Sequence, residues 1–243
     1  MSAEELHDLL IKQMRAVHGE YPDLALEKGE GGRFTVVGSL GFCVRRDGKE
    51  VQDAYEIAIV IPHDYPLSPP GLKEVGGRIP KSFHRLSDDG TLCLGAPLAV
   101  RMAFAKHRSL LCYIQNQVVP LLFSHSYKER FGEMPYGELP HGGEGILQYY
   151  KDTFAVDEVL GVLGLLQILA DDTYRGHYPC PCSSGRKLRK CHGPTLLAIK
   201  EYQGQDDFLM DFVMVLHHVK GDGDIREFYS VLPRRIAERT CRD

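Results

Sequence analysis

Residues 54–61 read AYEIAIVI, and residues 62–70 continue as PHDYPLSPP. Isoleucine and valine dominate the first stretch, and such a run predicts a strand that is buried on both faces or nearly so. The second stretch holds four of the 14 prolines. Because proline lacks a backbone N–H donor, this stretch cannot form a regular helix or a central strand. Together they predict a buried strand that runs into a rigid, extended loop.

Upstream of this strand, the sequence predicts one helix and two short strands. Apolar residues recur at three- and four-residue steps over residues 3–18, which is typical of an amphipathic helix. Ser2 is the expected N-cap, with Glu5 as its capping-box partner. Short strands are expected over 34–37 and 41–45, on either side of a Gly-Ser link.

Downstream, a short strand is expected over 71–75, followed by a long ordered loop. Residues 78–100 show no period, and a loop of that length inside a compact domain is usually functional. Helical periodicity returns over 109–123, with Pro120 as a late kink, and over 146–154.

The remaining chain is expected to be helical at both ends of a basic segment. An amphipathic helix is predicted over 157–171, and two further helices over 195–202 and 207–217. Residues 173–200 hold six Lys or Arg and no acid. This change of character predicts a domain boundary near residue 173.

The composition excludes several classes of protein. With 43% hydrophobic and 26% charged residues, the chain has enough apolar material for a core. A net charge of −4 argues against a general nucleic-acid coat protein. No apolar run reaches 18 residues, so no membrane partner is expected. The acidic N-terminus is not a signal peptide, and the seven cysteines are an odd number, so we expect a reducing cytoplasm.

Cys180, Cys182, Cys191 and His192 fall within 13 residues. Thiolate and imidazole are ligands that zinc prefers, and four of them complete a tetrahedral shell. Gly185 lets the backbone turn between the two halves of the cluster. These residues predict a zinc ion with a structural role, because no coordination position is left open. The alternatives are a redox dithiol or incidental cysteines.

Residues 178–193 resemble the SEC-C zinc-binding motif, an accessory module found on diverse proteins. Ser183 stands where many members have Gly. The resemblance implies a metal site and names no reaction. The basic residues around the cluster either stabilise the anionic thiolates or bind a phosphate backbone or an acidic protein face. These residues are Arg186, Lys187, Arg189 and Lys190.

A second candidate site lies in the long loop, where residues 83–94 read FHRLSDDGTLCL. A loop cysteine near a histidine and carboxylates is a candidate nucleophile. Local chemistry alone favours the other interpretation, in which Cys93 is a small buried apolar group between two leucines.

The order of features resembles the ubiquitin-conjugating enzyme fold over residues 5–155. In that family a Tyr-Pro-x-x-Pro-Pro segment, here 65–70, precedes a His and then the Cys that takes the ubiquitin thioester. His84 and Cys93 match these two residues. The segment 136–150 is similar to one in bacterial ubiquitin-conjugating-like proteins. The resemblance implies an α+β fold with an N-terminal helix, an antiparallel meander sheet, an active-site loop and C-terminal helices.

One departure from the family concerns the residue that stabilises the oxyanion during attack by the amine. Eukaryotic members have His-Pro-Asn, whereas this chain has HRL at 84–86 and no Asn. His141 is a candidate substitute donor, or it only orders a Gly-rich turn. His84 is expected to brace the loop rather than transfer a proton. Asp89, with Asp88, is expected to make the turn, and assistance to an incoming amine is the other interpretation.

The resemblance implies a transferase that accepts a ubiquitin-like modifier on Cys93 and passes it to an amine. Its partners would be an activating-enzyme homologue, the modifier and an acceptor protein, in a bacterial conjugation or antiviral defence system. The alternative is an inactive module of the same fold that docks protein or nucleic acid. The expected parts are a ubiquitin-conjugating-like domain over 1–155, a connecting amphipathic helix over 156–172, the SEC-C motif over 173–193 and a helical extension over 194–243.

Overall fold

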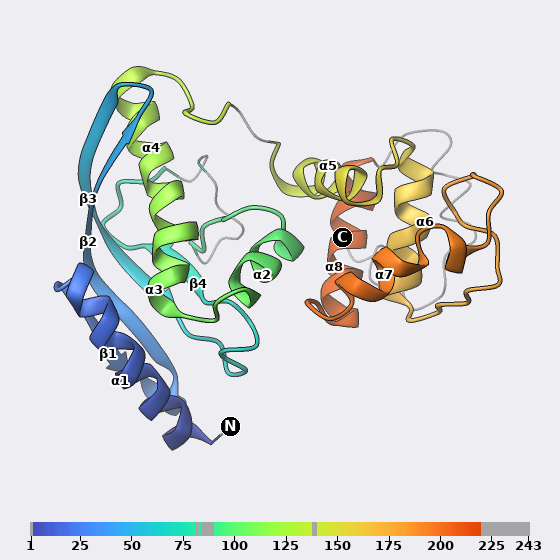
Figure 1. Cartoon of the computed structure of the whole chain (residues 1–243). Coiled ribbons are helices and arrows are strands. Elements are labelled where there is room, and N and C mark those ends of the chain that lie inside the picture. The colour runs from blue at the N-terminus through green and yellow to red at the C-terminus, as the bar shows by residue number, and fades with distance from the viewer. Residues whose placement is uncertain (1, 81–82, 84–89, 138–139, 220–243) are drawn as a thin grey trace. The chain divides into compact units, whose positions relative to one another are not determined.

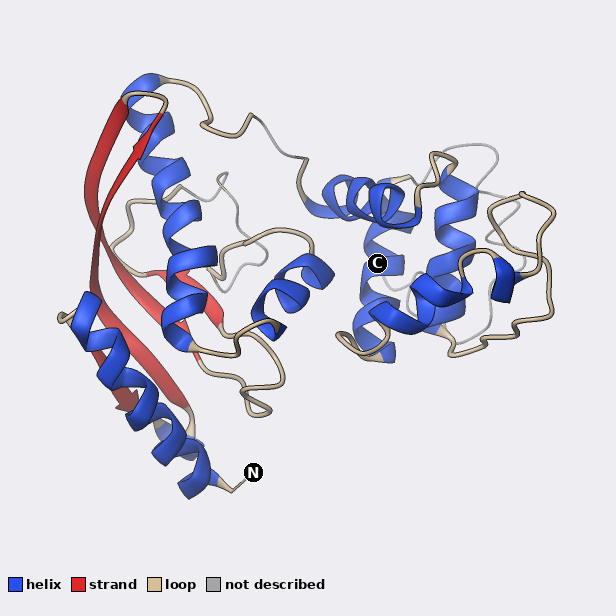
Figure 2. Cartoon of the chain, viewed as in Figure 1, coloured by secondary structure: helices blue, strands red, loops and turns tan. Residues whose placement is uncertain are grey.

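The residues that the computed structural model describes are 2–80, 83, 90–137 and 140–219. The chain forms two compact units, of which the first comprises residues 1–94 and 100–139 and the second residues 95–99 and 140–243 (Figure 1). The first unit combines a sheet with helices, which confirms the α+β class. The second unit is built from helices and a Cys/His segment (Figure 2).

A four-stranded antiparallel sheet organises the first unit. Its spatial order follows the chain, so the sheet is a simple meander. The strands are β1 (Leu24–Lys28), β2 (Phe34–Arg46), β3 (Lys49–Val60) and β4 (Gly71–Glu74).

The strand β2 is continuous where the sequence predicted two short strands. Gly38 lies inside it with a φ of 137°, and a Cβ atom there would stand 2.1 Å from the carbonyl oxygen of Asp23. The glycine therefore lets β1 begin close to β2 instead of breaking the strand. The hairpin to β3 turns at Asp47 and Gly48, whose φ values of 50° and 76° suit the twist of the two strands.

The N-terminal helix α1 spans Ala3–Glu20, two residues longer than predicted. The predicted capping box is present, since Ser2 and Glu5 each accept a hydrogen bond from the other's backbone N–H. The buried face of α1 joins the main core and packs beside β1 and α3. Its buried residues are Leu6, Leu10, Met14 and Val17.

The predicted helix over 109–123 is longer and less regular than expected. It runs as α3 (Leu110–Tyr113), one π-helical stretch (Ile114–Val118) and α4 (Val119–Phe131). Pro120 explains the irregularity, because it offers no N–H to the carbonyl four residues before it, and the helix widens at that point. The helix does not end at Pro120 but continues as α4, which packs against β2 and β3.

The helix α2 (Pro97–Ala105) lies where the sequence predicted loop. Its residues read PLAVRMAFA, apolar almost all round, so they show no amphipathic period. The long loop therefore ends at residue 96 rather than at residue 100.

A buried polar cluster fastens α4 to β3. The hydroxyl of Tyr55 lies 2.8 Å from Nδ1 of His125 and 2.7 Å from Oγ of Ser126. Beside it, the guanidinium of Arg78 bonds Asp53 at 2.7 Å and Glu129 at 2.6 Å and lies over the Tyr55 ring. Burial lowers the pKa of His125, so its imidazole is neutral near pH 7.

Helices of the second unit pack around α8. Both α5 and α6 contact α8, and α7 follows directly on the Cys/His segment. A buried hydrogen-bond network joins α5 to α8 and to the turn before α8, because Tyr150 Oη and Gln203 Nε2 donate to the Asp211 carboxylate at 2.7 and 2.6 Å. The helices are α5 (Gly142–Phe154), α6 (Val159–Ala170), the short 3₁₀ turn η3 (Leu188–Lys190), α7 (Gly193–Ile199) and α8 (Gln205–His218).

The boundary between the units differs from the predicted one. Residues 140–155, expected at the end of the first domain, group with the second unit because α5 packs on α8. Residues 156–172 were expected to connect two domains, but α6 buries most of its surface inside the second unit. The second unit therefore includes both of these helices as well as the Cys/His segment.

Candidate functional site

Cys93 lies in the first unit, directly after a short stretch that pairs with β4. Thr91 forms an antiparallel bridge with Lys73, and the backbone N–H of Leu92 donates to Leu72 at 2.8 Å. The side chain of Leu92 is buried, whereas Cys93 is partly exposed. The alternation along this stretch thus anchors one residue in the core and turns the next one toward the surface.

The other predicted catalytic residues are His84, Asp89 and His141. His84 and Asp89 lie outside the described residues. His141 is the N-cap residue of α5 and belongs to the second unit, whereas Cys93 belongs to the first. The role of His141 as an oxyanion donor therefore stays a prediction.

The four predicted metal ligands come together in the second unit. One donor atom from each of Cys180, Cys182, Cys191 and His192 lies within 4.8 Å of the other three. Cys180 Sγ is 3.2 Å from His192 Nδ1, and Cys191 Sγ is 3.5 Å from Cys182 Sγ. This cluster could hold a metal ion.

The local backbone explains how ligands from both ends of the segment meet. Pro179 pairs with Lys187 in an antiparallel bridge, and Cys180 N–H donates to Arg186 at 2.9 Å. Between them the chain turns at Ser183 and Gly185, which have φ values of 59° and 70°. A left-handed conformation is easy for glycine and strained for serine. The predicted role of Gly185 is confirmed, and the unusual Ser183 occupies a position that favours glycine.

His192 is oriented by a bond that the sequence did not reveal. Its Nε2 lies 2.7 Å from the carbonyl oxygen of Phe154, the last residue of α5. Because a carbonyl can only accept, Nε2 carries the proton and Nδ1 presents its lone pair to the cluster. A carbonyl that accepts from the other ring nitrogen in this way fixes the tautomer of a metal-ligating histidine.

The Cys-Pro-Cys segment packs directly on the backbone of α6. A Cβ atom added to Gly164 would stand 2.6 Å from Cβ of Pro181, and one added to Gly161 would stand 3.5 Å from Cα of Cys182. The two glycines therefore give room for the ligand segment to approach the helix. The amphipathic pattern of α6 predicted a helix but gave no sign of this function of its glycines.

Polar groups surround the sulfur atoms. Ser184 Oγ lies 3.1 Å from Cys182 Sγ, and Arg186 Nη2 donates to Cys191 Sγ at 3.2 Å. Burial raises the pKa of the Cys180 thiol to about 11. Burial also acts to raise the pKa of Cys182, but hydrogen bonds from Ser184 and the neighbouring thiols outweigh it and lower that pKa to about 6. These surroundings thus favour the thiolate on Cys182 and disfavour it on Cys180.

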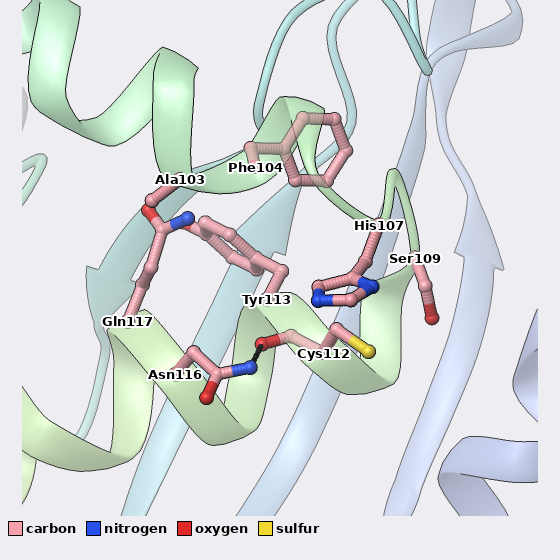
Figure 3. Close-up of a pocket in the computed structure, with 8 residues that line it drawn as sticks. All are labelled: Ala103, Phe104, His107, Ser109, Cys112, Tyr113, Asn116 and Gln117. Atoms are coloured by element: carbon pink, nitrogen blue, oxygen red, sulfur yellow. Dashed lines mark hydrogen bonds between the residues drawn. The ribbon is translucent and has the colours of Figure 1, made fainter.

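A small cavity adjoins the π-helical stretch in the first unit (Figure 3). His107 and Cys112 line it together with Gln117, whose Oε1 is buried without a hydrogen-bond partner. The nearby Asn116 side chain donates back to the carbonyl of Cys112 at 2.8 Å. The sequence has no hydrophobic period that would have predicted this cavity. Pro120 indicates only that the helix beside it is irregular.

Comparison with known proteins gives no assignment. No protein-family profile, curated protein or solved structure matches this chain. In the described part of the chain, no helix by itself has the length and apolar composition needed to cross a bilayer. Only α5 and α6 taken together have that length and composition, and they are bent by 87° relative to each other.

Proposed function

We propose that the first unit is a ubiquitin-conjugating-like transferase in which Cys93 carries a modifier as a thioester. The observation that supports this most directly is the position of Cys93, partly exposed directly after a buried residue paired with β4. The element order of helix, antiparallel meander, loop and helices also agrees with the resemblance noted in the sequence.

The chemistry needs a nucleophile, an oxyanion donor and no cofactor. The Cys93 thiolate attacks the carbonyl carbon of a thioester on an activating enzyme, forming a new C–S bond as the enzyme's own thiolate leaves. An acceptor amine then attacks this carbonyl, loses a proton and expels the Cys93 thiolate. Thioester exchange is nearly balanced in energy, so activation with ATP must come from the partner enzyme.

Intact-mass analysis tests this proposal. The chain is incubated with ATP, an activating-enzyme homologue and a ubiquitin-like protein from the same genome. We expect one adduct that thiol treatment removes, that Cys93→Ala abolishes and that Cys93→Ser converts to a thiol-resistant ester. Cys43→Ser is the matched control, because Cys43 is an exposed cysteine on β2 of the same unit. An adduct that persists in Cys93→Ala, or none with the native chain, would contradict the proposal and favour a docking module.

For the second unit we propose a structural zinc ion held by Cys180, Cys182, Cys191 and His192. Bonds of about 2.3 Å to sulfur and about 2.0 Å to nitrogen in a tetrahedron separate ligand atoms by roughly 3.5 to 3.8 Å. Three of the six separations between the ligand atoms are 3.2 to 3.5 Å, close to this range, and all six are within 4.8 Å. Three sulfur donors and one imidazole also agree with the softness of zinc.

Metal analysis tests the zinc site. We expect one zinc ion per chain in the native protein and none in the double variant Cys180→Ser/Cys182→Ser. The double variant Cys43→Ser/Cys112→Ser is the control, since both cysteines lie in the first unit. Unchanged zinc in the first variant would remove these ligands from the proposal.

A further inference from the structure

The Cys/His segment carries a group of cations that the metal site does not use. Arg175, Lys187, Arg189 and Lys190, called the basic surface below, are all exposed. Residues 173–200 contain no acid, although the whole chain has a net charge of −4. Positive charge is therefore concentrated on this segment and is not a property of the whole molecule.

Backbone pairing brings these cations together. Pro179 pairs with Lys187, and the N–H of Arg189 donates to the carbonyl of Gly176 at 3.0 Å. A Cβ atom on Gly176 would stand 3.1 Å from Cβ of Arg189. The segment 175–179 thus runs alongside 187–190, so the backbone positions that carry these cations lie close together.

The basic surface has no internal counter-charge. Within the described residues, no ion pair involves any of its four cations, whereas Lys200 on the same segment pairs with Asp172. Arg186 differs from them because it bonds the sulfur of Cys191. Four unpaired cations in one region form an attractive site for a polyanion.

An exposed aromatic ring lies within this surface. The side chain of Tyr178 is 57% exposed, and the ring of His177 stands 4.7 Å from it at an angle of 82°. The backbone carbonyl of Tyr178 accepts a hydrogen bond from the N–H of Leu188, and the side chain of Leu188 is buried. The backbone of Tyr178 is therefore fixed beside the residues that carry the cations, while its ring remains accessible. Bases of single-stranded nucleic acids stack on rings of this kind.

We propose that the basic surface binds single-stranded nucleic acid, with phosphates on its four cations and one base stacked on Tyr178. An acidic protein is the other polyanion to consider. A specific protein interface usually has a buried apolar centre, and Tyr178 is the only large apolar side chain exposed between residues 173 and 192. A duplex would leave the ring unused, because its bases are already stacked. The proposal does not depend on Cys93.

Fluorescence anisotropy with the zinc-loaded full chain tests this inference. The probes are fluorescein-labelled, mixed-sequence single strands of about 12 nucleotides, one of RNA and one of DNA. We expect the slope of log K against log salt concentration to be about −3, since four cations each contribute about −0.7. A duplex of the same sequence and a fluorescein-labelled polyglutamate peptide are measured in parallel.

Two variants locate the binding site. Lys187→Glu/Arg189→Glu should weaken binding of the single strand at least about tenfold. Lys12→Glu/Arg15→Glu changes the net charge equally on the exposed face of α1 and should leave binding unchanged. Tyr178→Ala should weaken single-strand binding at least about fivefold, and Tyr178→Phe should preserve it because the ring remains. Zinc content is measured for every variant, and Cys93→Ala should bind like the native chain.

Several results would overturn the inference. These are no binding by the native chain, equal losses in the two charge-reversal variants, or unchanged binding in Tyr178→Ala that retains its zinc. Tighter binding of polyglutamate than of either single strand would assign the surface to an acidic protein instead. Equal binding of the duplex and the single strand would remove the base-stacking role of Tyr178. If RNA and DNA differ, the ratio of their affinities identifies the preferred nucleic acid.

Discussion

His192 and Phe154 connect the Cys/His cluster to α5: the imidazole Nε2 donates a hydrogen bond of 2.7 Å to the carbonyl of Phe154, the last residue of the helix. The ring of Phe154 also lies edge-on to the imidazole, with centroids 6.2 Å apart. The histidine is thus placed for two functions, ligation of a metal through Nδ1 and attachment to α5 through Nε2. These functions can be separated by substitution.

His192→Cys should keep the metal but weaken the second unit. A fourth thiolate completes a Cys₄ shell, while the hydrogen bond to Phe154 is lost, which costs about 1 kcal/mol of unfolding free energy. His192→Ala should lose both. Metal content and urea denaturation of the two variants measure this difference. Equal stability of His192→Cys and the native chain would show that the Phe154 bond contributes nothing.

Removal of the metal should unfold the second unit selectively. The cluster holds residues 180–192 against α5 and α6, and a segment of this size has little core of its own. We expect a chelator to reduce helical circular dichroism and to expose residues 140–219 to protease, while the first unit persists as a resistant fragment. Equal protease resistance of both units in chelator would argue against a structural metal.

Gly164→Ala should destabilise the second unit, because its Cβ atom would stand 2.6 Å from Cβ of Pro181. Overpacking of this kind costs about 1 to 3 kcal/mol. The matched control is Gly19→Ala in α1, where a Cβ atom meets nothing within 4 Å and should be neutral or stabilising by up to about 1 kcal/mol. Thermal unfolding of both variants gives the comparison. A neutral Gly164→Ala would mean that Pro181 can move away from α6.

The first unit should lose stability as the pH falls below about 6.5. Burial lowers the pKa of His125 in the folded state, so the unfolded chain binds more protons in this range and the free energy of unfolding decreases with falling pH. His125→Gln should flatten this dependence below about pH 6.5. Urea denaturation across this range, monitored on the first unit, provides the measurement. An unchanged slope in His125→Gln would assign the dependence to another group.

A second loss of stability should occur at more acidic pH. The guanidinium of Arg78 lowers the pKa of Asp53 far below its ordinary value, so the carboxylate stabilises the folded state above about pH 4 and loses this effect as the pH falls further. Asp53→Asn should remove this acidic step and leave the His125 step. Denaturation below about pH 4 separates the two, and an acidic step that survives in Asp53→Asn would contradict the assignment.

Local signals in the sequence predicted many elements correctly. The capping box of Ser2 and Glu5 and the left-handed turn at Gly185 depend on neighbouring residues, and both are present. The cluster of three cysteines and one histidine was also recognisable, because its members are close together in the chain. Such features follow from short-range chemistry, which a single sequence contains.

Features that depend on distant residues were missed. Gly38 reads as a break in a strand unless the approach of Asp23 is known, and α2 has no apolar period to indicate a helix. The placement of α5 depends on its packing with α8, more than fifty residues later. The acceptor for His192 is a backbone carbonyl, and every residue has one, so no side-chain pattern could have identified Phe154.

The close contact between Pro181 and Gly164 also bears on how this protein can diverge. Side chains on the inner side of the Cys/His segment pack against the glycines of α6 at close range, so few substitutions should be tolerated there. The turn from Ser183 to Arg186 is exposed, but its left-handed residues and the contact of Arg186 with the Cys191 sulfur restrict it as well. Related chains should therefore change the Cys-Pro-Cys segment and the facing glycines of α6 together, so that the two positions covary.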